Sequence, residues 1–183
     1  GPKLPLVISL AAGLLLALAL PPWGWWPLAF VAFALFSRQL DEPSRRGRAK
    51  RGALFALGWF VPSVFWMLDF PLPGYGVVLG LWGGFWAVAA MVCPPGRWRW
   101  PALVGAAVLA ELLRWSWPFG GQPLATVAMT QAGSPLGPTV RLLGPLLLAA
   151  LVVVVGIALD AFTSGSRRTG ARALVGATAA VLR

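Results

Sequence analysis

The 34 residues from Leu4 to Ser37, LPLVISLAAGLLLALALPPWGWWPLAFVAFALFS, contain no charged side chain. They form two apolar runs separated by Pro21–Pro27, a stretch rich in proline and tryptophan. Proline interrupts a helix, and tryptophan concentrates at the headgroup level of a bilayer. The stretch therefore predicts a helical hairpin in a membrane, with spans over about 4–20 and 26–40.

The composition of the whole chain agrees with this prediction. Of 183 residues, 58% are hydrophobic, 11 are Trp and only 11% are charged, against roughly a quarter charged in a soluble domain. A soluble domain of this size needs a largely polar exterior. We therefore predict an all-α, polytopic transmembrane helical bundle of six to seven helices, forming a single domain over 1–183. The further spans are expected over 52–68, 77–92, 101–114, 140–162 and 173–183.

Residues 115–139 lie between the last long spans and are uncharged but rich in Pro, Gly, Ser, Thr and Gln. Loops of this length are usually functional or disordered, and this one has many apolar residues. It is typical of a re-entrant segment or an arm-like periplasmic loop. Elsewhere we expect a kink at Pro62, a turn over 71–76, and close helix contacts at Gly80, Gly83 and Gly84.

The distribution of basic residues predicts the orientation of the spans. With the N-terminus in the cytoplasm, 12 of the 15 basic residues lie on the cytoplasmic side, as the positive-inside bias requires. They are Lys3, Arg38, Arg45, Arg46, Arg48, Lys50, Arg51, Arg97, Arg99, Arg167, Arg168 and Arg172. This predicts a multi-pass protein of a bacterial inner membrane, with the C-terminus in the periplasm after an odd number of spans.

Two absences restrict the chemistry that the chain can perform. It contains no His, so it has no Ser-His or Cys-His nucleophile and no imidazole metal ligand, and a single cysteine excludes an internal disulfide. We predict no metal, no cofactor and, because the basic residues form short runs between apolar stretches, no nucleic-acid partner. Cys93 could act as a nucleophile with Lys50 and Glu42, but its apolar setting favours a small buried hydrophobe.

Glu111 and Arg114 are the charged pair most suited to a site. On a helix they share one face at i and i+3 and can form an ion pair. The pair either fixes the packing, with Arg141 as an alternative partner, or forms the polar floor of a lipid headgroup site. Together with Gln122 and Gln131 they are our candidates for a substrate cavity or arm. Asp69 and Asp160 are interpreted as interfacial charges.

Several motifs together resemble the membrane part of the apolipoprotein N-acyltransferases. Each motif is weak alone, but their order and spacing over about 130 residues are specific. They are LPPWGWWPLA (20–29), LGWF (57–60) followed by VFW (64–66), AELLR (110–114), PFGG (118–121) and QAGSPL (131–136). Where the family usually has Gly-Phe-Pro-Trp, this chain has Gly121-Gln122-Pro123-Leu124, and Leu143-Gly144-Pro145 replaces a Gly-Gly pair.

The resemblance implies a membrane bundle that carries a periplasmic nitrilase-like domain with a Glu-Lys-Cys triad. Such an enzyme moves an acyl chain from a phospholipid donor to the N-terminal diacylglyceryl-cysteine of a lipoprotein acceptor. No segment of this chain resembles the nitrilase-like domain, so none of its residues is assigned a catalytic role. We expect the chain to be the truncated N-terminal membrane domain, inert alone and scaffolding the reaction.

Two other functions remain open from the sequence. One is a non-catalytic scaffold for a membrane-associated enzyme such as a polyprenyl-phosphate mannosyltransferase, with basic loops over 45–51 and 167–172 as the docking surface. The other is a subunit of a small-solute transporter, which would place polar groups of several helices at the membrane midplane.

Overall fold

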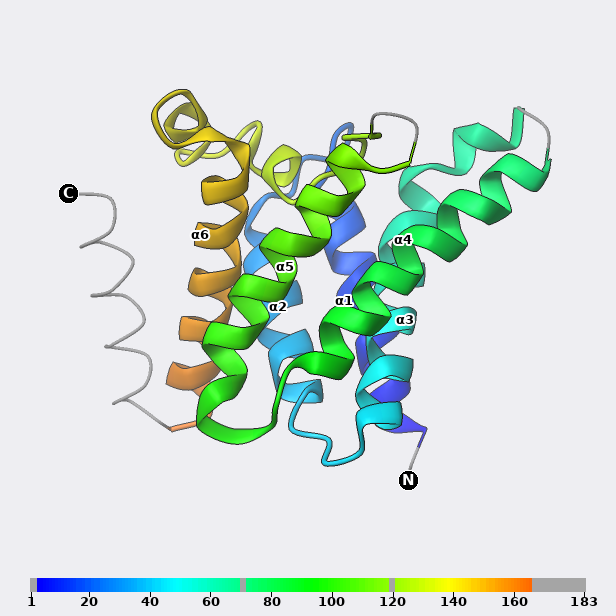
Figure 1. Ribbon diagram of the computed structural model, residues 1–183. Helices are drawn as coiled ribbons and strands as arrows, with labels where there is room; N and C mark the ends of the chain where they lie inside the picture. Colours follow the sequence, from blue (N-terminus) through cyan, green and yellow to red (C-terminus); the bar gives the residue numbers. More distant parts are fainter. Residues whose placement is uncertain (1–2, 70–71, 119–120, 166–183) are drawn as a thin grey trace.

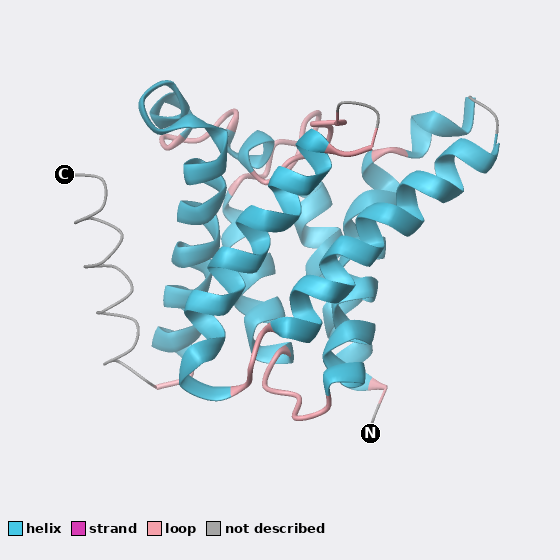
Figure 2. Cartoon of the chain, in the orientation of Figure 1, coloured by secondary structure: helices cyan, strands magenta, loops and turns pink. Residues whose placement is uncertain are grey.

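The computed structural model describes residues 3–69, 72–118 and 121–165, and these form a bundle of six α-helices (Figure 1). Four short 3-10 segments lie between the helices, and the described residues contain no strand, which confirms the all-α prediction (Figure 2). The predicted seventh span, 173–183, lies outside the described residues. The helices are α1 (Leu4–Leu18), α2 (Pro27–Gln39), α3 (Arg45–Ser63), α4 (Leu72–Val92), α5 (Arg99–Ser116) and α6 (Val140–Thr163).

Successive helices run in alternating directions, so their connections gather at two ends of the bundle (Figure 1). Helix α3 packs between α1 and α4, while α6 packs against α2 and α5. Residues 117–118 and 121–139 lie at one end, which we call the arm end. The connections 40–44 and 93–98 lie at the other, which we call the basic end because it carries most of the arginines.

Glycines set the closest helix approaches. An added Cβ at Gly13 of α1 would overlap the carbonyl oxygen of Phe55, and one at Gly58 of α3 would overlap that of Leu10. The backbones of α1 and α3 therefore touch. Gly80 and Gly84 are exposed, and a Cβ at either would meet no atom of the described residues within 4 Å, so the contacts predicted at these two glycines are wrong, whereas Gly83 is buried. Glycine content alone cannot show which face of a helix meets a neighbour.

Aromatic rings fill the centre between α2, α3 and α4. Phe36 stacks on Phe55 with ring centroids 4.1 Å apart, and Trp59 and Trp86 meet edge to face at 5.5 Å. All four side chains are fully buried. Aromatic pairs add about 0.5–1.5 kcal/mol beyond their buried area, so this cluster gives the bundle a rigid core.

Helix α3 differs most from its predicted span. It begins at Arg45, where the Ser44 hydroxyl accepts a hydrogen bond from the Gly47 amide at 3.3 Å, so the basic run is helical and not a loop. It ends at Ser63, which puts Pro62 at its end and not at a central kink. The predicted turn over 71–76 is also wrong, because α4 already begins at Leu72.

Two helical stretches among the described residues have the length and apolar character of membrane spans, Pro73–Val92 and Gly144–Thr163. Helix α1 is apolar but has only 15 residues. Helix α3 begins with five basic residues, and α5 carries three charged ones. Six or seven membrane spans therefore remain a prediction.

Ion pairs join the elements of the basic end. Asp160 of α6 accepts from Arg38 of α2 at 2.6 Å and lies 3.3 Å from Arg99 of α5, which also pairs with Asp41. Asp160 is only 3% exposed, so it ties three helices together and is more than an interfacial charge. Asp69 is the last residue of the 3-10 segment Phe65–Asp69.

Candidate functional site

The arm, of which residues 117–118 and 121–139 are described, folds back onto the end of α5 from which it leaves. The Trp117 amide donates to the Leu113 carbonyl, and the Gln122 amide donates to the Arg114 carbonyl, both at 2.8 Å. Gly121 lies against the α5 backbone with φ +89°, and a Cβ there would overlap the carbonyl oxygen of Trp115. Glycine is required at this turn because other residues rarely adopt that φ and have no space for a side chain.

Glu111 and Arg114 form a fully buried ion pair inside this turn. Arg114 Nη1 donates to Glu111 Oε1 at 2.5 Å, and both side chains are 0% exposed. Each partner also holds the backbone of the arm: Arg114 Nη2 donates to the Leu124 carbonyl, and the Val127 amide donates to Glu111 Oε2 at 3.0 Å. The pair therefore fixes the packing of the arm against α5, which is the first of the two roles predicted for it.

Three aromatic rings surround the Arg114 guanidinium. Its central carbon lies 4.2 Å from the ring centroid of Trp82, 4.6 Å from Phe60 and 5.4 Å from Trp59. A cation over an aromatic face gains about 0.5–2 kcal/mol when water is excluded. The rings of α3 and α4 thus help to hold a charge that belongs to α5, and they link the arm to the bundle core.

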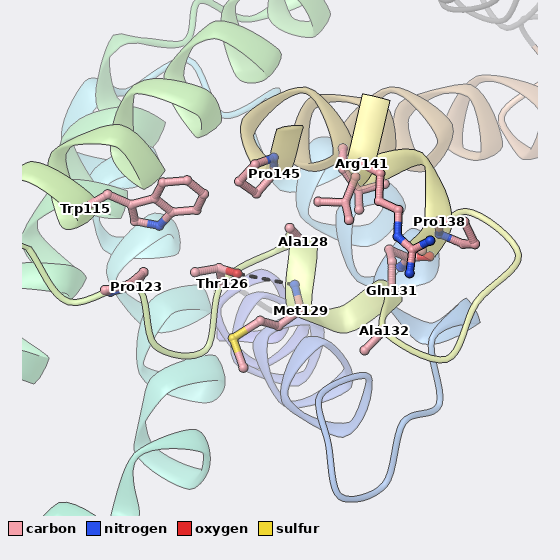
Figure 3. Close-up of a pocket in the computed structure, with 13 residues that line it drawn as sticks. Trp115, Pro123, Thr126, Ala128, Met129, Gln131, Ala132, Pro138, Arg141 and Pro145 are labelled. Carbon is pink, nitrogen blue, oxygen red and sulfur yellow. Dashed lines mark hydrogen bonds between the residues drawn. The ribbon is translucent and has the colours of Figure 1, made fainter. Parts of the chain in front are cut away.

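A cavity of about 800 Å³ lies between the arm and the arm-end turns of α5 and α6. Trp115 and Pro123 border one end, and Gln131, Pro138 and Arg141 border the other (Figure 3). The full lining comprises Trp115, Pro123, Thr126, Ala128, Met129, Gln131, Ala132, Gly137, Pro138, Val140, Arg141, Pro145 and Leu148. The walls are mainly apolar, with one cation and a few uncharged polar groups, as is usual for small-molecule sites.

The structure places the two predicted glutamines differently. Gln131 is fully buried and lines the cavity; its Nε2 donates to the Thr130 hydroxyl at 3.0 Å, whereas its Oε1 has no partner among the described residues. Gln122 contributes only its backbone amide to the turn and does not line the cavity. Of the four predicted site residues, Glu111 and Arg114 form an ion pair, Gln131 lines the cavity, and Gln122 belongs to neither the pair nor the cavity lining.

Two cavity residues have roles that the sequence did not indicate. Arg141 was the alternative partner for Glu111, but it is exposed at the cavity border, and none of the ion pairs of the described residues includes it. Trp115 belongs to none of the motifs identified in the sequence, yet it lines the cavity and its indole Nε1 is buried without an acceptor in the described part of the chain. No periodic signal marks either residue, because the cavity forms only when the arm packs against the ends of α5 and α6.

The proposed Cys93 nucleophile does not find an activating environment. Cys93 is fully buried just beyond α4, and burial raises the pKa of its thiol to about 11 although Arg48 lowers it slightly. Glu42 is engaged elsewhere, with Oε2 2.5 Å from Arg51 Nη2. A buried neutral thiol is a packing residue and a poor nucleophile. The described residues also hold no group of three metal-ligating side chains.

The fold and site together define a class: an all-helical bundle in which a buried ion pair fastens a re-entering arm over one end. The family described as the apolipoprotein N-acyltransferase N-terminal domain matches residues 12–158, which include α2 to α5, the arm, the second half of α1 and most of α6. The chain belongs to this family, and the predicted resemblance is confirmed.

Individual relatives agree with the family match. The chain is 29% identical over 171 residues to an apolipoprotein N-acyltransferase of Pseudomonas paraeruginosa, covering 84% of this chain and 33% of that protein. It is 32% identical over 93 residues to one of Rhodopseudomonas palustris, covering 48% and 16%, and 29% identical over 148 residues to one of Pseudomonas syringae pv. tomato, covering 71% and 29%. These matches span a third or less of the relatives' length.

Proposed function

We propose that the chain is the membrane domain of a bacterial apolipoprotein N-acyltransferase, in which it scaffolds acyl transfer from a phospholipid to the N-terminal diacylglyceryl-cysteine of a lipoprotein. Its family membership and the names of its relatives support this activity for the protein of which the chain forms part. The bundle would lie in the inner membrane with the basic end in the cytoplasm. The arm end would then face the periplasm, where the lipoprotein substrate is found.

Apolar surface on the outside of the bundle supports insertion into a membrane. Leu4, Val7 and Leu14 of α1 are between 44% and 61% exposed and recur at helical spacing along one face. Helix α5 exposes Leu109, Leu112 and Leu113, and α4 exposes Val77, Val88 and Val92. Soluble monomers rarely expose apolar patches this extensive. Lipid tails would cover these faces. This would include the faces of α1 and α5, which are too short or too charged to be recognised as membrane spans from length and hydropathy.

One observation carries the functional proposal: the arm is fastened over a cavity whose chemistry fits a phospholipid. Apolar side chains such as Met129, Pro145 and Leu148 offer contacts for an acyl chain, while the exposed Arg141 offers a charge for a phosphate. Arginine is well suited to phosphate because its planar donors can bind two oxygens. Gln131 adds an unpaired buried carbonyl oxygen, which could accept from a hydroxyl or an amine of a substrate.

Glu111 and Arg114 act in this proposal as positioning residues. They hold the Leu124 carbonyl and the Val127 amide, and thereby fix the arm segment that leads to Ala128 and Met129 of the cavity wall. Gln122 contributes to the same turn through its backbone. The reacting groups would belong to a part of the protein outside this chain.

The test is acyl transfer by the full-length protein that contains this chain, reconstituted with phospholipid and a diacylated lipopeptide. We expect an N-acylated peptide, and we expect Met129→Trp to slow its formation at least about tenfold by narrowing the cavity. Leu142→Trp is the matched control, because Leu142 is 87% exposed and does not line the cavity. Absence of product from the folded wild-type protein contradicts the proposal and revives the scaffold and transporter alternatives. Equal rates for the two variants contradict the role of the cavity.

A further inference from the structure

The basic end contains a second, smaller cavity, of about 420 Å³, between the start of α3 and the end of α4. It is lined by Pro43, Arg45, Arg48, Met91, Val92, Pro94 and Pro95. Apolar and charged side chains thus line the same small cavity. The start of α3 and the end of α4, which border it, lie at the opposite end of the bundle from the arm (Figure 1). This cavity is independent of the acyl-transfer site.

Arg48 is a buried cation that forms no ion pair with a carboxylate among the described residues. Its side chain is 4% exposed, and its Nη atoms donate to the carbonyls of Glu42, Pro43 and Met91 at 2.7–3.1 Å. All three acceptors are neutral, and no ion pair of the described residues includes Arg48. Its Nε–H is buried and lacks an acceptor in this part of the chain. Burying a cation without an anion is costly, so the site is electrostatically incomplete.

The start of α3 adds positive charge where a helix disfavours it. Arg45 and Arg46 occupy the first turn, which contains no acidic residue. The N-terminus of a helix carries about half a positive charge, and basic residues there are destabilising unless an anion is near. Glu42 offsets only part of the positive charge at the start of α3, because its carboxylate already pairs with Arg51 at 2.5 Å and accepts a hydrogen bond from the Ser44 amide at 3.3 Å.

We propose that this cavity binds the phosphate group of an anionic phospholipid in the leaflet at the basic end. The phosphate would lie between Arg45 and Arg48 near the α3 N-terminus, and the lipid's glycerol and first methylenes would contact the cavity face formed by Met91 and Val92. Basic pockets between membrane helices on the cytoplasmic side are the usual binding places for such headgroups. The proposal uses the membrane location of the bundle but not its enzymatic role.

The test measures lipid binding to the delipidated full-length protein in detergent, with phosphatidylglycerol and phosphatidylcholine as probes. We expect phosphatidylglycerol to bind at least about tenfold more tightly, and Arg45→Gln to remove about tenfold of that affinity, equivalent to about 1.4 kcal/mol. Arg45 is exposed and makes no ion pair among the described residues, so its variant should fold. Arg46→Gln is the matched control: it removes the same charge from the same turn, but Arg46 does not line the cavity.

Each result is decisive for the lipid site. Loss with Arg45→Gln and less than about twofold change with Arg46→Gln supports it. Equal losses from both variants indicate a diffuse basic surface and overturn it, as does equal affinity for the two lipids. Inorganic phosphate that displaces phosphatidylglycerol at equal concentration overturns the lipid assignment in favour of a free phosphate. Acyl transfer measured on the same variants separates this proposal from the proposed function, because neither arginine lies near the arm.

Discussion

Replacing Glu111 by Gln should destabilise the protein far more than the same replacement of Glu42. Both glutamates pair with an arginine at 2.5 Å, and they differ in burial. Glu111 and Arg114 are 0% exposed, whereas Glu42 and Arg51 are 24% and 14% exposed. Glutamine keeps the shape but has one acceptor oxygen where Glu111 uses two, so the change removes the charge together with one of the hydrogen bonds from Arg114 and the Val127 amide.

The magnitude follows from what remains around Arg114. Removing one partner of a buried pair costs about 3–5 kcal/mol, because the other charge stays buried and unpaired. The three aromatic rings and the Leu124 carbonyl remain and offset part of this cost. We therefore expect about 3 kcal/mol for Glu111→Gln, or about 6–12 °C in Tm for a domain of this size. Glu42→Gln should cost at most about 1 kcal/mol.

The assay is thermal unfolding of the full-length variants in one detergent, with amide hydrogen exchange over the arm. Exchange at Val127 should accelerate in Glu111→Gln, since this amide donates to the altered side chain. The double variant Glu111→Gln, Arg114→Met should recover most of the lost Tm, because it buries neither charge. Equal Tm losses at positions 42 and 111, or a double variant no more stable than the single one, would refute the assignment of a buried pair that fastens the arm.

Two further predictions concern the core. Gly58→Ala should lower stability by about 1–3 kcal/mol, since its Cβ would overlap the Leu10 carbonyl. Gly84→Ala should be neutral or slightly stabilising, because Gly84 is exposed and its Cβ would meet no atom of the described residues within 4 Å. Thermal unfolding of both variants tests this. Cys93, with a thiol pKa of about 11, should react with maleimide at about pH 8 at least about 100-fold more slowly than a free cysteine, because its thiolate fraction is about 0.1% at this pH against about a quarter for the free cysteine. The reaction should become faster as the pH is raised towards 11. Fast labelling of the folded protein at pH 8 contradicts the buried setting.

The sequence could predict where helices occur, because helix formation depends largely on local features. The uncharged stretch Leu4–Ser37 did form two helices with Pro21–Trp26 between them, and the predicted family is confirmed. Boundaries failed where apolar character alone was used to place them. The basic run after Ser44 is helical because a cap and a continuous hydrogen-bond pattern start α3 there, which hydropathy does not register.

The sequence could place Glu111 and Arg114 on one helical face, since an i, i+3 spacing fixes that geometry. It could not show that the pair would hold the arm, because Leu124 and Val127 reach it only through the turn at Gly121. Arg141 had the right charge to be a partner for Glu111, but α6 places it at the cavity border instead. Partner choice between distant segments depends on packing, which spacing does not encode.

By itself, then, the sequence determined the helical class of the protein, its family and the charge asymmetry along the chain, because composition, local periodicity and motif order express these directly. The tertiary structure alone decided which glycines bring helices together, which charged groups of different helices pair, and where the two cavities open. Those features arise where segments far apart in the chain meet, so they depend on the relative placement of helices whose faces look equally apolar in the sequence.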